Sequence, residues 1–183
     1  MEKVMKGKAW KFGHDLINDT HIFAFSHVLE HNSGVPLEKL IHHVMEPVNP
    51  EFASGVRKGD FVVAGRNFGY GKAHRQGVMC FKMLGISAVI ADSIGRGMLK
   101  NHLYFGLPAL CSEGISDKIN QGDELEVNVL NGEIKNLSTG ETLRATPAFP
   151  PGHPLFPIME AGGEVSYVKM KLATLNKLQK RRR

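Results

Sequence analysis

Residues 61–77 read FVVAGRNFGYGKAHRQG, and this stretch decides the fold. Its first four residues form an apolar run of strand length. The glycines at positions 65, 69 and 71 are typical of a loop whose backbone turns sharply or approaches another group closely. Residues 78–84 then carry apolar side chains at helical spacing. The stretch therefore predicts a strand, a glycine-rich loop and a helix that begins after the loop.

The flanking segments extend this unit in both directions. On the C-terminal side, Gly85 ends the helix, residues 86–91 predict a buried strand, and residues 95–104 predict a second helix. On the N-terminal side, residues 10–25 predict a short strand that runs into a loop, and residues 37–45 predict a helix. Strand and helix alternate here as they do in an α/β fold.

The C-terminal part has a different pattern. Residues 124–130 alternate between apolar and polar side chains, and the Asn-Gly pair at 131–132 joins them to residues 133–137. This arrangement predicts a β-hairpin. Residues 165–172 predict a late strand or helix.

Length and composition indicate one globular unit. The 183 residues are 42% hydrophobic and 22% charged, which excludes disorder and a coiled coil. Neither the α/β unit nor the hairpin can hold a core alone, so we expect a single mixed α/β domain over residues 1–176 and a basic tail at 177–183. The net charge of +5 comes from residues 164–183, which hold seven Lys and Arg against one acid. With no apolar run of membrane-spanning length and no signal peptide, we expect a cytoplasmic chain without a membrane partner.

The cysteines and the paired histidines give no metal site by themselves. Cys80 and Cys111 are too few for a disulfide framework, an iron–sulfur cluster or a four-cysteine zinc site. We expect both to be small buried hydrophobic side chains. His42 and His43 point to different faces of a predicted helix, so we expect no metal ligands in this chain.

The glycine-rich loop predicts an anion site. Backbone N–H groups and the positive end of a helix dipole converge where such a loop enters a helix, and Lys72, His74 and Arg75 add side-chain cations. The segment fits neither a phosphate-binding P-loop nor a dinucleotide fingerprint, because the required glycine and hydroxyl positions hold other residues. The alternative is a turn that only packs a helix on a strand, with its cations in water.

Several ordered motifs carry a resemblance to a known family. These are residues 63–71 (VAGRNFGYG), 85–91 (GISAVIA), 100–101 (KN) and 106–108 (GLP). Together they resemble the swivel domain of the aconitase superfamily, in the version that forms the separate small subunit of 3-isopropylmalate dehydratase and its homoaconitase-like relatives. Residues 8–13, 122–125 and 160–163 resemble the family's opening strand, hairpin and closing motif.

The resemblance implies a fold, a reaction and a partner. The fold would be a swivelling β/β/α domain, and the substrate a small hydroxy-dicarboxylate that is dehydrated and rehydrated. A large subunit would carry a [4Fe–4S] cluster through three cysteines, and this chain would bind none. The chemistry is proton abstraction beside a carboxylate while a Lewis acid assists loss of hydroxide.

The loop departs from the family pattern Phe-Gly-Cys-Gly-Ser-Ser-Arg-Glu-His. Gly69 and Gly71 are kept, but Lys72 replaces the serine that acts as base, and His74 and Arg75 replace the Arg-Glu pair. The resemblance implies that these five residues bind substrate, with Lys72 as the catalytic base. A lysine can serve as a base when burial and nearby cations keep it neutral. The alternative is that Lys72 is a carboxylate clamp without proton transfer.

A second family motif, Asn/Asp-Thr-Asp-x-Ile, aligns with residues 18–22, which read NDTHI. Strict register puts Thr20 at the position of the family's second acid and leaves Asp19 one residue early. The resemblance implies that Asp19, Thr20 and His21 reach the substrate. His21 and His27 also fit polar loop residues that touch no ligand.

Three functions compete at this stage. The first is the small subunit of an iron–sulfur hydro-lyase that acts with a large subunit. The second is a non-catalytic swivel domain that binds an anion or a partner. The third is nucleic-acid binding by the basic tail, which the shortage of interleaved aromatic residues disfavours.

Overall fold

The computed structural model describes the backbone of residues 3–181 and the side chains of residues 3–177. The described strands form one sheet in the order β7-β6-β5-β1-β2-β3-β4-β8. Their bounds are β1 Val4–Lys11, β2 Phe61–Ala64, β3 Ala88–Ala91, β4 Ala109–Cys111, β5 Glu124–Asn128, β6 Glu133–Asn136, β7 Thr142–Arg144 and β8 Thr146–Pro147. The α-helices are α1 Phe25–Asn32, α2 Leu37–Leu40, α3 Phe52–Gly55, α4 Gln76–Met83, α5 Arg96–Phe105, α6 Phe156–Glu160 and α7 Glu164–Arg181. Short helical turns are η1 Asn18–Ile22, η2 Ile41–His43 and η3 Ile115–Lys118.

The parallel half of the sheet, β1 to β4, carries the core on both of its faces. All residues of β2 and β3 are buried, as expected for parallel strands covered on two sides. Val62 and Ala64 pack in one hydrophobic cluster with side chains of α4 and α5. Phe61 and Val63 point the other way and pack in a second cluster. The side chains of β2 thus alternate between the two clusters. The loop that follows Ala64 lies at the carboxyl edge of the parallel strands.

The antiparallel half closes the second cluster. β5 pairs with β1 along residues 4–8, and β6 and β7 continue the sheet outward. Leu125, Val127 and Ile134 alternate inward and share a core with Phe61 and Val63 of the parallel half. The two halves therefore form one mixed α/β domain, and the predicted fold class and hairpin are confirmed.

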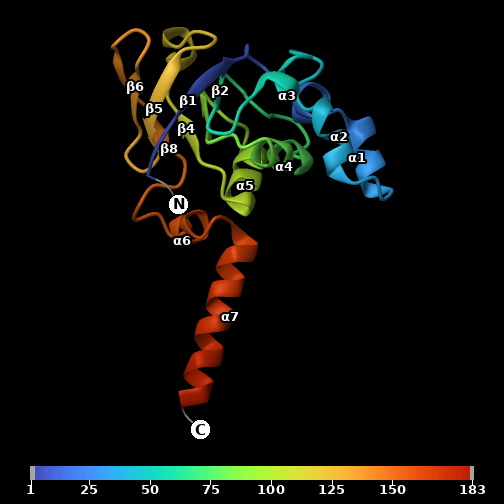
Figure 1. The fold of residues 1–183 in the computed structure, drawn as a ribbon, viewed down its shortest axis with the longest axis vertical. Helices are drawn as coiled ribbons and strands as arrows, with labels where there is room; N and C mark the ends of the chain where they lie inside the picture. Colours follow the sequence, from blue (N-terminus) through green and yellow to red (C-terminus); the bar gives the residue numbers. More distant parts are fainter. Residues whose placement is uncertain (1–2, 182–183) are drawn as a thin grey trace.

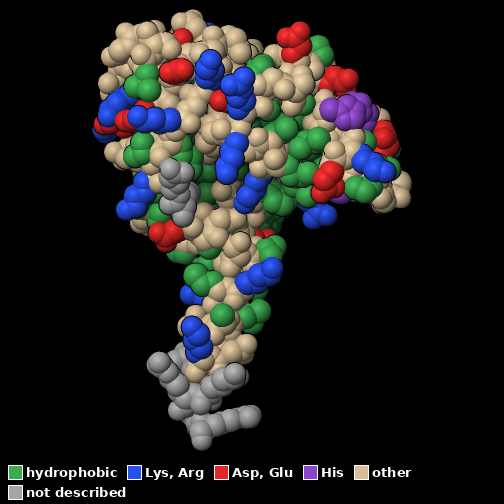
Figure 2. Space-filling view, viewed as in Figure 1, with side chains coloured by type: hydrophobic (Ala, Val, Ile, Leu, Met, Phe, Trp, Pro, Cys, Tyr) green, Lys and Arg blue, Asp and Glu red, His purple; other side chains and the backbone are tan. Residues whose placement is uncertain are grey.

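The last helix, α7, extends away from the sheet, with basic side chains along it (Figures 1 and 2). Its exposed apolar side chains are Val165, Val168, Met170, Leu172 and Leu175. The boundary expected after residue 176 falls inside this helix, and the domain division stays a prediction. No helix in the described part of the chain is both long and apolar enough to span a membrane.

Three sequence predictions about local structure were wrong or incomplete. The first strand is Val4–Lys11 rather than a segment starting at Trp10, because pairing with β5 uses residues 4–8. The helix predicted over 37–45 ends at η2, since Met45 adopts a φ of +60° and its N–H donates to Ile22 O at 2.8 Å. β7 was missed because three residues give too short an alternation to recognise.

Candidate functional site

The loop between β2 and α4 has a backbone that only glycine allows at two places. Gly69 has φ of +69°, and a Cβ there would lie 2.6 Å from Met98 Cγ. Gly71 has φ of +86°, and a Cβ there would lie 3.2 Å from Ile17 Cγ2. Any side chain at either position would be strained and crowded. The two glycines thus let the loop pass tightly between α5 and the N-terminal segment.

Buried asparagine side chains hold the loop in place. Asn18, 1% exposed, donates from Nδ2 to the carbonyl oxygens of Lys72 at 2.9 Å and His74 at 3.0 Å. Its main-chain N–H donates to Tyr70 O at 2.9 Å. Asn101 on α5 donates from Nδ2 to Ala73 O at 3.1 Å. These bonds satisfy loop carbonyls that would otherwise be costly to bury.

Sequence reasoning did not find Asn18 and Asn101 as supports of the loop. Asn18 is the first residue of the NDTHI motif, and Asn101 belongs to the Lys-Asn pair already noted. Both signals were present in the sequence. Their roles were missed because the two side chains bind backbone carbonyls more than 25 residues away, which no local pattern shows.

The predicted catalytic and binding side chains lie on the outer side of this loop. Lys72 and Arg75 are exposed, whereas His74 is half-buried with its ring 5.2 Å from the ring of Phe25 on α1. His74 Nε2 lies 4.0 Å from Asp19 Oδ2 and has no hydrogen-bond partner among the described residues. A buried polar atom without a partner is costly, and functional sites are where this cost is tolerated.

The π-helical turn η1 brings one acidic residue to the loop and uses another polar residue to close itself. A Cβ on Gly71 would lie 3.8 Å from Asp19 Oδ1, so this carboxylate borders the loop. His21 Nδ1 accepts a hydrogen bond from the N–H of Ile17 at 3.0 Å, which closes the turn. Thr20 is exposed. Contact of any of these three residues with substrate stays a prediction.

The balance of charge at the loop favours an anion. Lys72, His74 and Arg75 provide up to three cations against the single carboxylate of Asp19. Arg75 stands at the N-cap of α4, and no side chain caps that helix. Free N–H groups and the positive end of α4 therefore add to the attraction for a carboxylate.

A pocket of about 610 Å³ borders the loop on the side of α5 and α7. Its polar lining includes Arg75, Gln76, Lys100 and Glu164. Within the described part of the chain, its lining includes neither Lys72 nor Asp19. Lys72, the predicted base, thus lies on open surface outside the pocket, where a second protein could complete a site, whereas His74 and Arg75 line the pocket.

The two cysteines do not suit an iron–sulfur cluster. Burial raises the pKa of the Cys80 thiol to about 12 and that of the Cys111 thiol to about 11. A cluster ligand must be a thiolate, and three are needed when one iron stays open. Cys80 is fully buried as predicted, and Cys111 is half-buried.

Comparisons with known proteins cover almost the whole chain. It is 41% identical over 175 residues to the isopropylmalate/citramalate isomerase small subunit of Methanocaldococcus jannaschii, across 94% of this chain and 98% of that one. It is 37% identical over 167 residues to the methanogen homoaconitase small subunit of Methanothermobacter thermautotrophicus, across 91% and 92%. A crystal structure of 3-isopropylmalate dehydratase from Methanocaldococcus jannaschii matches with a TM-score of 0.83 and 31% identity, across 95% and 98%. No protein-family model matches the chain.

Proposed function

Because this chain belongs to the family of 3-isopropylmalate dehydratase and homoaconitase small subunits, we propose that it positions a hydroxy-dicarboxylate in a site shared with a large subunit. It is the small subunit of a hydro-lyase, and catalysis occurs in the heteromer. The observation that carries this conclusion is the 41% identity over 175 residues, with no large part of either chain left unmatched. We place the complex in the cytoplasm, in keeping with the biosynthetic enzymes that it resembles.

Substrate binding falls to the cations of the loop. Two carboxylates on a small acid suit Arg75 and His74, which directly precede the first residue of α4. Arginine binds a carboxylate through two parallel hydrogen bonds, and the helix N-terminus adds N–H donors. Asp19 Oδ2 lies 4.0 Å from His74 Nε2, so this carboxylate stands beside the imidazole that would face the substrate.

Lys72 takes the role of the base in this proposal. It would accept the proton from the carbon next to a substrate carboxylate, which requires a neutral amine. Lys72 is exposed in this chain, so the burial that favours the neutral form would come from the large subunit. If that burial does not occur, Lys72 binds a carboxylate instead and the proton goes to another group.

The family implies an iron–sulfur cluster on the large subunit. The residues of this chain do not fit such a group, because it has two cysteines and both thiols are held in the protonated form. We therefore assign the cluster to the partner. The contribution of this chain is to bind, orient and deprotonate the substrate.

A second candidate is a small subunit that binds the anion and the partner without catalysis. The exposure of Lys72 favours it, since this amine lies on open surface in the described chain. Its contacts to an anion would be the same as in the first proposal. The two candidates differ in turnover alone.

The test is reconstitution with the large subunit from the same source. The chain should co-purify with a larger iron- and sulfide-containing protein, and the pair should dehydrate an alkylmalate-type acid that neither subunit turns over alone. Complex formation without turnover of any such acid would support the second candidate. A chain that forms no complex, or that alone contains iron and sulfide, would contradict the proposal.

A further inference from the structure

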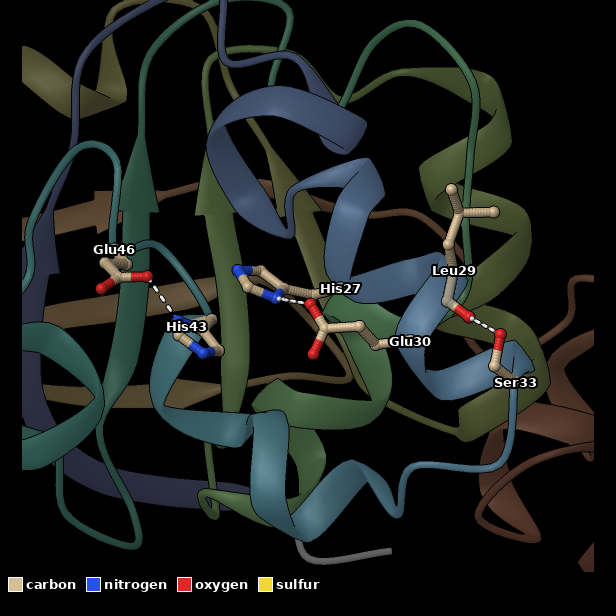
Figure 3. A network of polar contacts seen from close by, with 6 residues as sticks. All are labelled: His27, Leu29, Glu30, Ser33, His43 and Glu46. Carbon is tan, nitrogen blue, oxygen red and sulfur yellow. Dashed lines mark hydrogen bonds and ion pairs between the residues drawn. The ribbon is translucent and has the colours of Figure 1, made fainter.

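A cluster of histidine and glutamate side chains lies outside the glycine loop. His27 is on α1, His43 ends η2, and Glu46 is in the turn that follows. One nitrogen from each imidazole and one oxygen of Glu46 all lie within 4.8 Å of one another. Figure 3 shows the cluster, and Figure 2 shows histidine side chains gathered on this part of the surface. Two separate elements thus bring three possible ligands to one spot.

The backbone fixes this meeting of elements. Met45 adopts the left-handed conformation, with φ of +60°, and its N–H donates to Ile22 O at 2.8 Å. That bond ties the turn before Glu46 to the end of η1, just ahead of α1. A non-glycine residue in this region indicates local strain that surrounding structure must support. The position of Glu46 beside His27 is therefore set by the fold rather than by a mobile surface loop.

Carboxylates orient both imidazole rings. His43 Nδ1 lies 2.5 Å from Glu46 Oε2, and His27 Nδ1 lies 3.0 Å from Glu30 Oε1. The two rings are stacked, with centroids 3.8 Å apart and planes at 8°. For His27 the orienting carboxylate, Glu30, lies outside the ligand set, which is an arrangement that supports metal ligands in proteins.

Burial and charge suit an ion that enters from solvent. The side chains of His27 and His43 are 19% and 23% exposed, and that of Glu46 is 46% exposed. Glu46 contributes a carboxylate oxygen beside the two imidazole nitrogens. Binding an ion would replace the hydrogen bond between His43 and Glu46, and the side chains would rotate about their broad terminal torsions to bring the three ligand atoms, already within 4.8 Å of one another, onto the ion.

We propose that His27, His43 and Glu46 form a Zn²⁺ site, with water in the fourth position. Two imidazole nitrogens and one carboxylate oxygen are a known zinc ligand set, and the half-exposed position leaves room for the water. The sequence prediction of no metal ligands considered only His42 and His43 on one helix. It did not consider His27, which lies beside His43 only because the chain folds back between α1 and η2.

Zinc at this site would connect α1 to η2. Phe25, two residues before His27, packs against His74 of the glycine loop with ring centroids 5.2 Å apart. Fixing α1 therefore fixes one wall of that loop. The site would act as a structural clamp, and it needs only this chain and no large subunit.

The test is metal titration of the full chain, prepared without an affinity tag and freed of metal with a chelator. Calorimetry should show one Zn²⁺ per chain and a higher unfolding temperature with zinc, because only the folded chain has the site. Co²⁺ should give the absorption bands of a four-coordinate ion. Mg²⁺ should not bind, since it prefers oxygen ligands.

Variants identify the ligands. His27→Ala, His43→Ala and Glu46→Gln should each weaken Zn²⁺ binding by about 100-fold or more, beyond the 10- to 100-fold typical for losing an outer-shell partner. His42→Gln is the matched control, because His42 is exposed, adjoins His43 and is not in the ligand set. It should change binding by less than about threefold, below the 10- to 100-fold of losing an outer-shell partner, because it removes no ligand.

Three results would overturn the proposal. The wild-type chain binding no Zn²⁺ stoichiometrically is the first, and it does not depend on how any variant folds. The second is equal binding by the three ligand variants and the wild type. The third is a loss of Zn²⁺ binding in His42→Gln equal to that in the three ligand variants, which would mean that the proposed ligand set is wrong.

Discussion

The glycine loop has an inner and an outer region that are built in opposite ways. The loop frame, made of Asn18, Gly69, Gly71, Asn101 and the neighbouring His102, is mostly buried, and Asn18 and Asn101 hydrogen-bond to the loop backbone. The loop face, made of Lys72, His74 and Arg75, is exposed or half-buried. The frame is complete in this chain, whereas the face needs a ligand and a second protein. Changes in the frame should therefore alter stability, and changes in the face should alter binding and turnover.

The largest expected effect is on the face. Lys72→Arg keeps the positive charge but cannot accept a proton, because guanidinium stays protonated at any usable pH. In the reconstituted enzyme, turnover should fall by roughly 10²-fold or more, on the scale of lost general-base catalysis, while KM changes little. The unfolding temperature of the free chain should not change, since Lys72 is exposed.

Near-normal turnover in Lys72→Arg would make this residue a clamp only. The proton would then have to go to His74, to water or to a residue of the large subunit. That result would leave the difference between frame and face unchanged, but it would exclude Lys72 as the base.

The next effect is the loss of folding stability at acidic pH through His102 of the frame. Burial lowers the pKa of His102 to about 4, with Nδ1 bonded to Leu107 O at 3.0 Å. The unfolded chain takes up this proton near pH 6.5 and the folded chain only near 4, so stability falls as the pH drops through that window. The total loss from this group is up to about 3 kcal/mol.

Urea unfolding at several pH values between 6.5 and 4 measures this slope. His102→Asn should flatten it, whereas His42→Gln, at an exposed histidine, should leave it in place. An unchanged slope in His102→Asn would show that other groups control acid stability.

Asn18→Ala tests how far the frame supports the face. It removes two hydrogen bonds and leaves the carbonyls of Lys72 and His74 buried without them, which should cost about 2 kcal/mol. Asn120→Ala, at an exposed asparagine, should cost less than about 0.5 kcal/mol. Chemical denaturation gives both values. Equal values for the two variants would mean that the asparagine bonds do not hold the loop.

The smallest expected effect is at the C-terminus. A chain that ends at residue 176 loses five basic residues but none of the frame or face. Anion binding and unfolding temperature should match those of the full chain. Salt-dependent RNA binding that disappears on truncation would instead support nucleic-acid binding by the basic tail.

The sequence predicts the central fold well because its signals are local. β2 was predicted with its observed bounds, and α4 and α5 were displaced by one or two residues. The apolar runs and the glycines that end them lie within a few residues of one another. β1 and η2 were misjudged because pairing with β5 and the left-handed Met45 depend on distant parts of the chain.

The same difference between local and distant contacts applies to the site, where the loop face was predicted and the supports of the loop frame were not. Lys72, His74 and Arg75 are consecutive or nearly so, and a loop motif brings them to notice together. The support from Asn18 crosses 54 residues to Lys72, and the histidine cluster joins α1 to η2. Contacts of this kind follow from tertiary packing, which spacing along the sequence does not encode.

The central claim is that the loop face binds a carboxylate ligand. Equilibrium dialysis of the full chain with malate measures it directly, in the wild type and in Lys72→Ala/Arg75→Ala. Lys169→Ala/Lys171→Ala removes the same charge from α7 and is the control. The dissociation constant should be at least about tenfold higher in the loop variant, from the loss of charge-assisted hydrogen bonds, and unchanged in the control. Equal malate binding by the wild type and the loop variant would contradict this claim.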